Sequence, residues 1–134
     1  MKIIADYPPN FKAIEKRFGP LSDSVIFTYG GNIYVPAGGE IASHLMVHEE
    51  IHSKQQGDNP KSWWKRYLKD EKFRLEQEVE AYRAQFSFFK RTIKDRNRQT
   101  RFLYKIAADL SGTMYGSIVT HREAMSLITR GRSS

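Results

Sequence analysis

Residues 44–52 read HLMVHEEIH and contain the pattern His48-Glu49-x-x-His52, from which the rest of the chain can be interpreted. Apolar side chains recur at helical spacing in this stretch, and neither proline nor glycine occurs in residues 40–56, so we expect a helix there. Side chains four positions apart on a helix lie on one face, about a turn from each other. His48 and His52 are therefore expected to reach one metal ion from the same side.

The residue types in this pattern are those of a hydrolytic zinc site. Imidazole nitrogens bind Zn²⁺ well, and bound zinc lowers the pKa of a coordinated water to about 7. Glu49 flanks the two histidines without binding the ion, so it can take a proton from that water and later give it to a leaving amine. The pattern predicts hydrolysis of a peptide bond with Glu49 as the general base.

His44 lies on the same helix face, one turn before His48. It is eight residues from His52. That separation is about 12 Å along a helix axis, whereas zinc–nitrogen bonds are near 2 Å. We therefore expect His44 to be either an outer partner of the metal site or an ordinary polar residue.

A third ligand is expected from the next long helix, predicted over residues 72–92. Glu78 lies inside the apolar stripe of this helix, whereas Glu76 and Glu80 lie on its other side. A carboxylate among buried side chains is unfavourable unless it is paired or binds a cation. Glu78 is therefore predicted as the ligand, followed by Glu80 and then Glu76, and the last two are expected to be solvated. The stripe consists of Leu75, Val79, Tyr82, Phe86 and Phe89.

Two motifs of the chain together resemble a known family. His48-Glu49-x-x-His52, followed 26 residues later by Glu78-x-x-Ala81, resembles the gluzincin branch of the zincin metallopeptidases. The size of the chain looks like that of the very small gluzincins and related metallopeptidases of bacterial and phage genomes.

The resemblance covers about residues 33–85 and implies a Zn²⁺ cofactor held by His48, His52 and Glu78. It also implies a polypeptide substrate. This substrate is expected to lie in extended form along the edge of a hairpin, at residues 33–35, where main-chain hydrogen bonds hold it.

Two supporting roles of such a site have no fixed residue in this chain. Tyr82 stands where larger gluzincins carry an aspartate that supports a zinc-bound histidine, so either another acid such as Asp109 takes that part or the outer contacts are built differently. The oxyanion of peptide hydrolysis needs a second donor besides the metal. Tyr115 and His121, in or near an irregular segment at residues 112–120, are the candidates. The alternative is that Tyr115 is a packing aromatic and that His121 is an exposed residue in the first turn of the last helix.

The composition predicts one domain that spans residues 1–134. The 134 residues are 40% hydrophobic, which is enough for a buried core. We expect an α+β domain, mostly helical and zincin-like, with a small N-terminal β-sheet or hairpin packed on the helix of His48 and His52. A strand is predicted at residues 3–5, a hairpin at 25–35 with Gly30-Gly31-Asn32 as its turn, and helices at 11–18, 40–56, 60–68, 72–92, 97–110 and from the capping box of Thr120 and Glu123 to Gly131.

Cysteine is absent, so the sequence predicts neither a disulfide framework nor a thiolate metal site. Any metal has to be bound by His and carboxylate side chains. The N-terminus lacks the apolar stretch of a signal peptide, and no run approaches the roughly 20 apolar residues of a membrane span. We therefore expect a soluble cytoplasmic protein, and the resemblance adds phage association as an alternative setting.

The net charge of +7 is concentrated in residues 61–105, which hold 14 Lys or Arg against 6 Asp or Glu. This region predicts either an anionic partner or the solvated outer face of long helices. Two alternatives to a peptidase follow from these features. The first is a catalytically silent metal-binding protein, such as a phage or bacterial structural or effector component. The second is a basic nucleic-acid-binding protein, although no recognised binding motif accompanies the charge.

Overall fold

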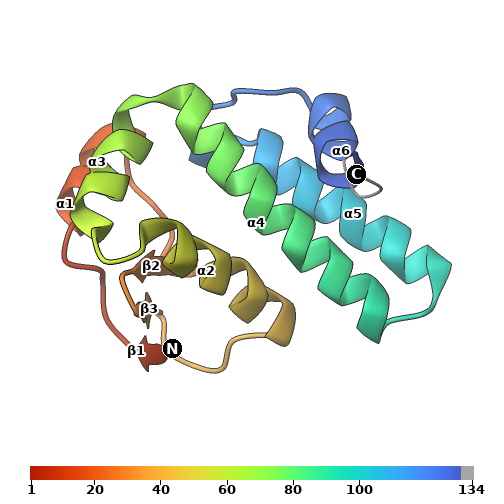
Figure 1. Ribbon diagram of the computed structural model, residues 1–134, viewed down its shortest axis with the longest axis horizontal. Helices are drawn as coiled ribbons and strands as arrows, with labels where there is room; N and C mark the ends of the chain where they lie inside the picture. The colour runs from red at the N-terminus through yellow and green to blue at the C-terminus, as the bar shows by residue number, and fades with distance from the viewer. Residues whose placement is uncertain (131–134) are drawn as a thin grey trace.

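The computed structural model describes residues 1–130 of the chain. Within this range the strands are β1 (Lys2–Ile4), β2 (Phe27–Tyr29) and β3 (Asn32–Tyr34). The helices are α1 (Phe11–Phe18), α2 (Ser43–Gln56), α3 (Pro60–Lys69), α4 (Glu71–Thr92), α5 (Arg96–Ser111), the 3₁₀ helix η1 (Thr113–Tyr115) and α6 (His121–Thr129). Figure 1 shows the small sheet at one end and the helical hairpin of α4 and α5 extending to the other. The expected class, mostly helical with a small N-terminal sheet, is confirmed.

The three strands form one mixed sheet in the order β1-β3-β2. β2 and β3 are the expected hairpin, because they are antiparallel with Thr28 opposite Ile33. Gly30 turns the chain between them with a φ of 63°, a conformation that costs glycine little. β1 pairs with the other side of β3 in parallel, so β3 is the central strand.

The substrate position expected along residues 33–35 is wrong, because both sides of β3 are taken. β2 pairs with one side and β1 with the other, and the Val35 N–H donates to the Ile4 carbonyl at 2.8 Å. The side chain of Ile33 is fully buried. The outer strand of the hairpin is β2, and this strand packs on α2.

α2 lies between the sheet and α4 and packs on both (Figure 1). It begins at Ser43 rather than at residue 40, because Gly38 and Gly39 have φ values of 72° and 89° and Ala42 is extended. The face that α2 turns to the interior is polar, which is unusual for a buried surface. Its buried side chains are His48, Glu49, His52 and Gln56.

The side chain of Gln56 fastens α2 to the hairpin. Its Oε1 accepts from the Gly30 N–H at 2.6 Å, and its Nε2 donates to the Thr28 carbonyl at 2.9 Å. Trp64 Nε1, from α3, donates to the same carbonyl at 2.9 Å. Ser53 Oγ adds a hydrogen bond to the Gly30 carbonyl. These contacts hold β2 beside the face of α2 that carries the histidines.

Side-chain caps mark the starts of α3 and α6, and the capping box predicted from the sequence is confirmed at α6. Asn59 Oδ1 accepts from the Ser62 N–H at the start of α3, and Thr120 and Glu123 form the reciprocal capping box of α6. The expected end of the last helix, Gly131, lies outside the described residues. Among the helices of residues 1–130, none combines the length and the apolar character that crossing a membrane requires.

Candidate metal centre

Three side chains from two helices converge on one point. α2 contributes Nε2 of His48 and of His52, which are 3.2 Å apart, and α4 contributes Oε1 of Glu78. This oxygen lies 3.1 Å from His48 Nε2 and 3.2 Å from His52 Nε2. All three residues are buried, with at most 6% of their surface exposed. The grouping that the sequence predicted is therefore confirmed.

The triangle of ligand atoms fits a zinc ion. Tetrahedral zinc with bonds of about 2.0–2.1 Å separates its ligand atoms by roughly 3.3–3.4 Å, close to the edges of this triangle. The Nε2 atoms of His48 and His52 are 3.2 Å apart, so they cannot both carry a proton directed at the other nitrogen. A cation or a single shared proton has to lie between them. Two imidazole nitrogens and one carboxylate oxygen also form a donor set that zinc takes when a fourth position stays open for water.

A glutamine holds each histidine at its other ring nitrogen. Gln85 Oε1 lies 2.9 Å from His48 Nδ1, and Gln55 Oε1 lies 2.8 Å from His52 Nδ1. An amide oxygen only accepts hydrogen bonds, so both Nδ1 atoms carry a proton. This arrangement leaves both Nε2 atoms for the triangle, as metal ligation requires.

The second ring nitrogen of His48 is hydrogen-bonded to an amide rather than to a carboxylate. Tyr82 packs its ring on His48 with the ring centroids 4.5 Å apart, and Gln85, one turn further along α4, makes the hydrogen bond. Asp109 is exposed and pairs with Lys105 Nζ at 3.3 Å. Of the two alternatives drawn from the sequence, Asp109 as the supporting acid is wrong, and a different set of outer contacts is confirmed.

Tyr67 positions the carboxylate of Glu78. Its hydroxyl donates to Glu78 Oε2 at 2.6 Å; this oxygen also lies 3.2 Å from His52 Nε2, whereas Oε1 lies within 3.2 Å of both histidines. Tyr67 is itself held by Arg74, whose Nε donates to the Tyr67 main-chain carbonyl at 3.3 Å. The Arg74 side chain is fully buried, and its guanidinium lies 5.0 Å from the ring of Phe18. α3 therefore contributes to the site although it supplies no ligand.

Glu78 and His52 stabilise each other's charge. Burial alone would lower the pKa of His52, but the adjacent Glu78 carboxylate raises this pKa to about 9. Burial alone would raise the pKa of Glu78, but His52 and His48 hold that pKa well below its usual range. Without a metal the pair is thus ionised at neutral pH, and a metal ion would displace the proton of His52.

Glu49 lies next to the triangle without being part of it. Thr28 Oγ1, on β2, donates to Glu49 Oε1 at 2.6 Å, and the glutamate is 6% exposed. Glu49 lines the same cavity as the three residues of the triangle. The carboxylate of Glu78 is therefore part of the triangle, and that of Glu49 is held beside it by the sheet.

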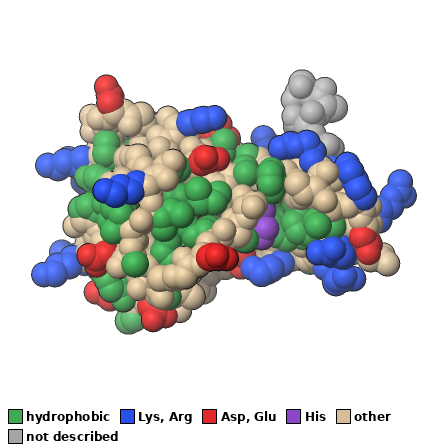
Figure 2. All heavy atoms as spheres, turned by 90° about the horizontal axis from the view of Figure 1, so that it is seen from below, with side chains coloured by type: hydrophobic (Ala, Val, Ile, Leu, Met, Phe, Trp, Pro, Cys, Tyr) green, Lys and Arg blue, Asp and Glu red, His purple; other side chains and the backbone are tan. Residues whose placement is uncertain are grey.

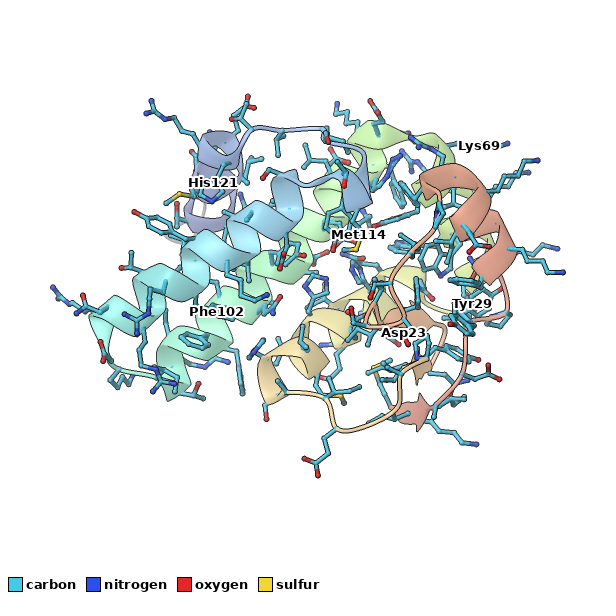
Figure 3. All side chains as sticks on the ribbon, turned by 180° about the vertical axis from the view of Figure 1, so that it is seen from behind. Asp23, Tyr29, Lys69, Phe102, Met114 and His121 are labelled. Atoms are coloured by element: carbon cyan, nitrogen blue, oxygen red, sulfur yellow. The ribbon has the colours of Figure 1, made fainter. Side chains whose placement is uncertain are left out.

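Two neighbouring hollows adjoin the cluster. The smaller one, of about 60 Å³, is lined by the triangle residues and Glu49, and it has room for a few water molecules but not for a peptide. The larger one, of about 440 Å³, lies between α2, α5 and residues 24–26. The residues that line both hollows are Val25, Ile26, His48, Glu49, Met114 and Tyr115. The size of the larger hollow is in the range of ligand pockets. Met114 and Phe102, which line this larger hollow, are labelled in Figure 3.

Tyr115 reaches both hollows and keeps its phenolic proton. Its hydroxyl lies 2.9 Å from that of Tyr82. Burial, together with the negative charge of Glu78, raises the pKa of Tyr115 well above its usual value. The hydroxyl is therefore a hydrogen-bond donor at neutral pH.

Three other residues considered from the sequence lie away from the cluster. Glu76 and Glu80 are exposed on α4, and Glu80 Oε1 accepts from Gln55 Nε2 at 2.8 Å. His121 is exposed on α6 with its Nε2 3.1 Å from the Tyr104 carbonyl, and it lines neither hollow (Figure 3). Neither glutamate completes the triangle, and His121 as an oxyanion donor is wrong.

Comparisons with protein-family models, with curated proteins and with solved structures found no match.

Four supporting residues were not identified from the sequence. Gln85 follows Glu78 by seven residues, so it lies on the same face two turns later, and this spacing is a signal that could have found it. Gln55 is adjacent to His52 on the helix surface and could have been found in the same way. Tyr67 and Thr28 carry no such signal, because their roles depend on contacts between separate elements.

We expect Tyr67→Phe to weaken zinc binding about tenfold, because it removes the donor that fixes Glu78 while keeping the buried ring. The dissociation constant can be measured by competition with a chromogenic chelator. Tyr104→Phe is the matched control, since Tyr104 is 51% exposed and is expected to have no effect. Equal zinc affinity in both variants would show that the hydroxyl of Tyr67 is dispensable.

Proposed function

We propose that this protein is a zinc-dependent metallopeptidase of the gluzincin type. The proposal rests on the convergence of His48, His52 and Glu78 within 3.2 Å of one another, with Glu49 beside the triangle and outside it. A structural zinc site is closed by four protein ligands, whereas three ligands facing a water-sized cavity suit catalysis. The nitrogen and oxygen ligands suit zinc, a borderline ion.

Zn²⁺ bound to these ligands would supply a Lewis acid that acidifies water and polarises a carbonyl group. Glu49 acts as the general base, because its carboxylate takes a proton from the attacking water and returns it to the leaving amine. Thr28 donates to Oε1 of this carboxylate and so leaves Oε2 for the proton. Gln85 and Gln55 keep both imidazole rings in the orientation that ligation requires.

Tyr115 is the proposed donor to the substrate carbonyl oxygen as negative charge develops there. The hydroxyls of Tyr82 and Tyr115 lie 2.9 Å apart, and Tyr115 can donate to the substrate when Tyr82 is the donor of this pair. The polypeptide substrate lies in the larger hollow, because only that one has room for it and it shares His48 and Glu49 with the cavity beside the triangle.

The direct test is a digest of denatured proteins by the zinc-loaded chain, with new N-termini identified by mass spectrometry. We expect cleavage that stops on chelation and returns with added zinc. The Glu49→Gln variant, which lacks the proposed general base, is the inactive control and is expected to show no cleavage. One bound zinc per chain without any cleavage would instead support the silent metal-binding alternative.

We infer that the end of the α4–α5 hairpin binds acidic segments of a polypeptide partner. Figure 2 shows Lys and Arg side chains gathered at this end of the molecule. The exposed cations of this surface are Arg91, Lys94, Arg96, Arg98, Arg101 and Lys105. Lys105 also lines the larger hollow, so the positive surface continues to the place proposed for the substrate.

Reversing two of these charges, in Arg98→Glu with Arg101→Glu, is expected to weaken binding of polyglutamate about tenfold at an ionic strength of about 0.1 M. Fluorescence anisotropy at several salt concentrations measures the effect. Lys12→Glu with Lys16→Glu makes the same change of charge on exposed positions of α1 and is the control. Tight binding of a DNA or RNA oligonucleotide but not of polyglutamate would favour the nucleic-acid alternative instead.

A further inference from the structure

The larger hollow contains a histidine that the proposed reaction does not use. Its lining includes His44 as well as His48 and Glu49. His44 lies one turn before His48, which is about 6 Å along the axis of α2.

Gln85 connects His44 to the metal ligand His48. Its Oε1 lies 2.9 Å from His48 Nδ1, and its Nε2 lies 2.9 Å from His44 Nδ1. A neutral His48 that binds metal through Nε2 carries its proton on Nδ1, so Gln85 Oε1 accepts and Gln85 Nε2 donates. His44 Nδ1 must then accept. The proton of the His44 ring is consequently held on Nε2.

Aromatic packing fixes the orientation of the His44 ring. Its centroid lies 4.8 Å from that of Phe102 and 6.1 Å from that of Phe89, and these two phenyl rings stack at 3.9 Å. Burial, Lys105 and His48 all lower the pKa of His44, so the ring is neutral at physiological pH. A neutral N–H in a fixed position is a donor suited to an uncharged carbonyl oxygen.

We propose that His44 is a substrate-positioning residue whose Nε2–H donates to a main-chain carbonyl of a polypeptide in the larger hollow. This inference rests on the proposed peptidase function. His44 and His48 are about 6 Å apart along the axis of α2, and an extended chain advances about 3.3 Å per residue, so the carbonyl that His44 contacts belongs to a residue roughly two positions from the cleaved bond. The apolar wall of the hollow then faces side chains of the substrate. It includes Leu45, Phe102 and Ile106.

The kinetic test compares His44→Phe with wild type on one peptide that the wild type cleaves. Phenylalanine keeps an aromatic ring beside Phe102 but has no N–H. We expect KM to rise about tenfold, the effect of one lost hydrogen bond, with kcat and zinc content unchanged. His44→Gln, which restores a donor, is expected to recover part of the loss. His121→Phe is the matched control, because this histidine lines neither hollow.

A second measurement tests the hydrogen-bond chain without any substrate. Nitrogen-15 chemical shifts of the imidazole rings in the zinc-loaded protein distinguish a protonated from an unprotonated nitrogen. We expect His44 with its proton on Nε2, and we expect Gln85→Leu to abolish this single tautomer. This measurement tests the position of the donor, and the change in KM separates substrate positioning from a merely structural role of His44.

The outcomes separate this inference from the proposed function. A wild-type protein that cleaves no peptide overturns the function and this inference with it. An active wild type whose KM is unchanged by His44→Phe overturns the inference alone. A His44 ring with its proton on Nδ1 also overturns it, because Gln85 would then not hold the donor on Nε2.

Discussion

Glu49→Gln is expected to lower kcat about a thousandfold while zinc stays bound. The substitution keeps the size of the side chain and an oxygen that can accept from Thr28 Oγ1, so the contact between β2 and α2 is preserved. It removes only the ability to take up a proton, and general bases contribute factors of about 10²–10⁴. The ligand triangle does not include Glu49, so metal affinity should change little.

The measurement pairs single-peptide kinetics with elemental analysis of the same preparation. Glu50→Gln is the matched control, since Glu50 is the exposed neighbour on α2 and should retain full activity. Loss of zinc from Glu49→Gln would make Glu49 a ligand rather than a base. Full activity of this variant would remove it from the mechanism.

Glu78→Gln is expected to weaken zinc binding by a factor of about a thousand or more. It removes one of three ligands and the only negative charge in the triangle, although the amide oxygen can still accept from Tyr67. Free zinc at a thousand times the dissociation constant stabilises a native protein by about 4 kcal/mol. For a domain of this size that corresponds to roughly 15 °C in the melting temperature.

Calorimetry with and without a chelator measures this difference. Chelation should lower the melting temperature of the wild type by roughly 15 °C and leave that of Glu78→Gln nearly unchanged. Glu80→Gln, on the exposed side of the same helix, should behave like the wild type. A chelation shift in Glu78→Gln as large as that of the wild type would mean that the metal is held elsewhere.

The ligand triangle could be predicted from sequence because each of its constraints is local. The four-residue spacing of His48 and His52 depends only on helix geometry, and Glu78 is singled out by its place in an apolar stripe. Each signal lies within a single helix. The structure then only has to bring α2 and α4 together, which burial of their inner faces favours.

The contacts of Tyr67 and Thr28 could not be predicted, because each joins two separate elements of the fold. Tyr67 has the spacing of an ordinary core aromatic, and only packing of α3 on α4 brings its hydroxyl to Glu78. Thr28 lies in a strand of three residues, too short for a pattern to show which face it turns to α2. The parallel pairing of β1 with β3 joins strands of three residues that are far apart in the sequence. No local pattern therefore shows that β3 is the central strand, with neither side free for a substrate.

The hairpin turn also sets the chemistry of α2. Successive strand residues point to opposite sides, so a shift of one position in β2 would turn Thr28 away from Glu49 and bring Phe27 or Tyr29 to that place. An aromatic ring there could neither orient the carboxylate nor leave room for water. Lengthening the glycine turn by one residue is therefore expected to abolish the proposed activity while His48, His52 and Glu78 stay in place.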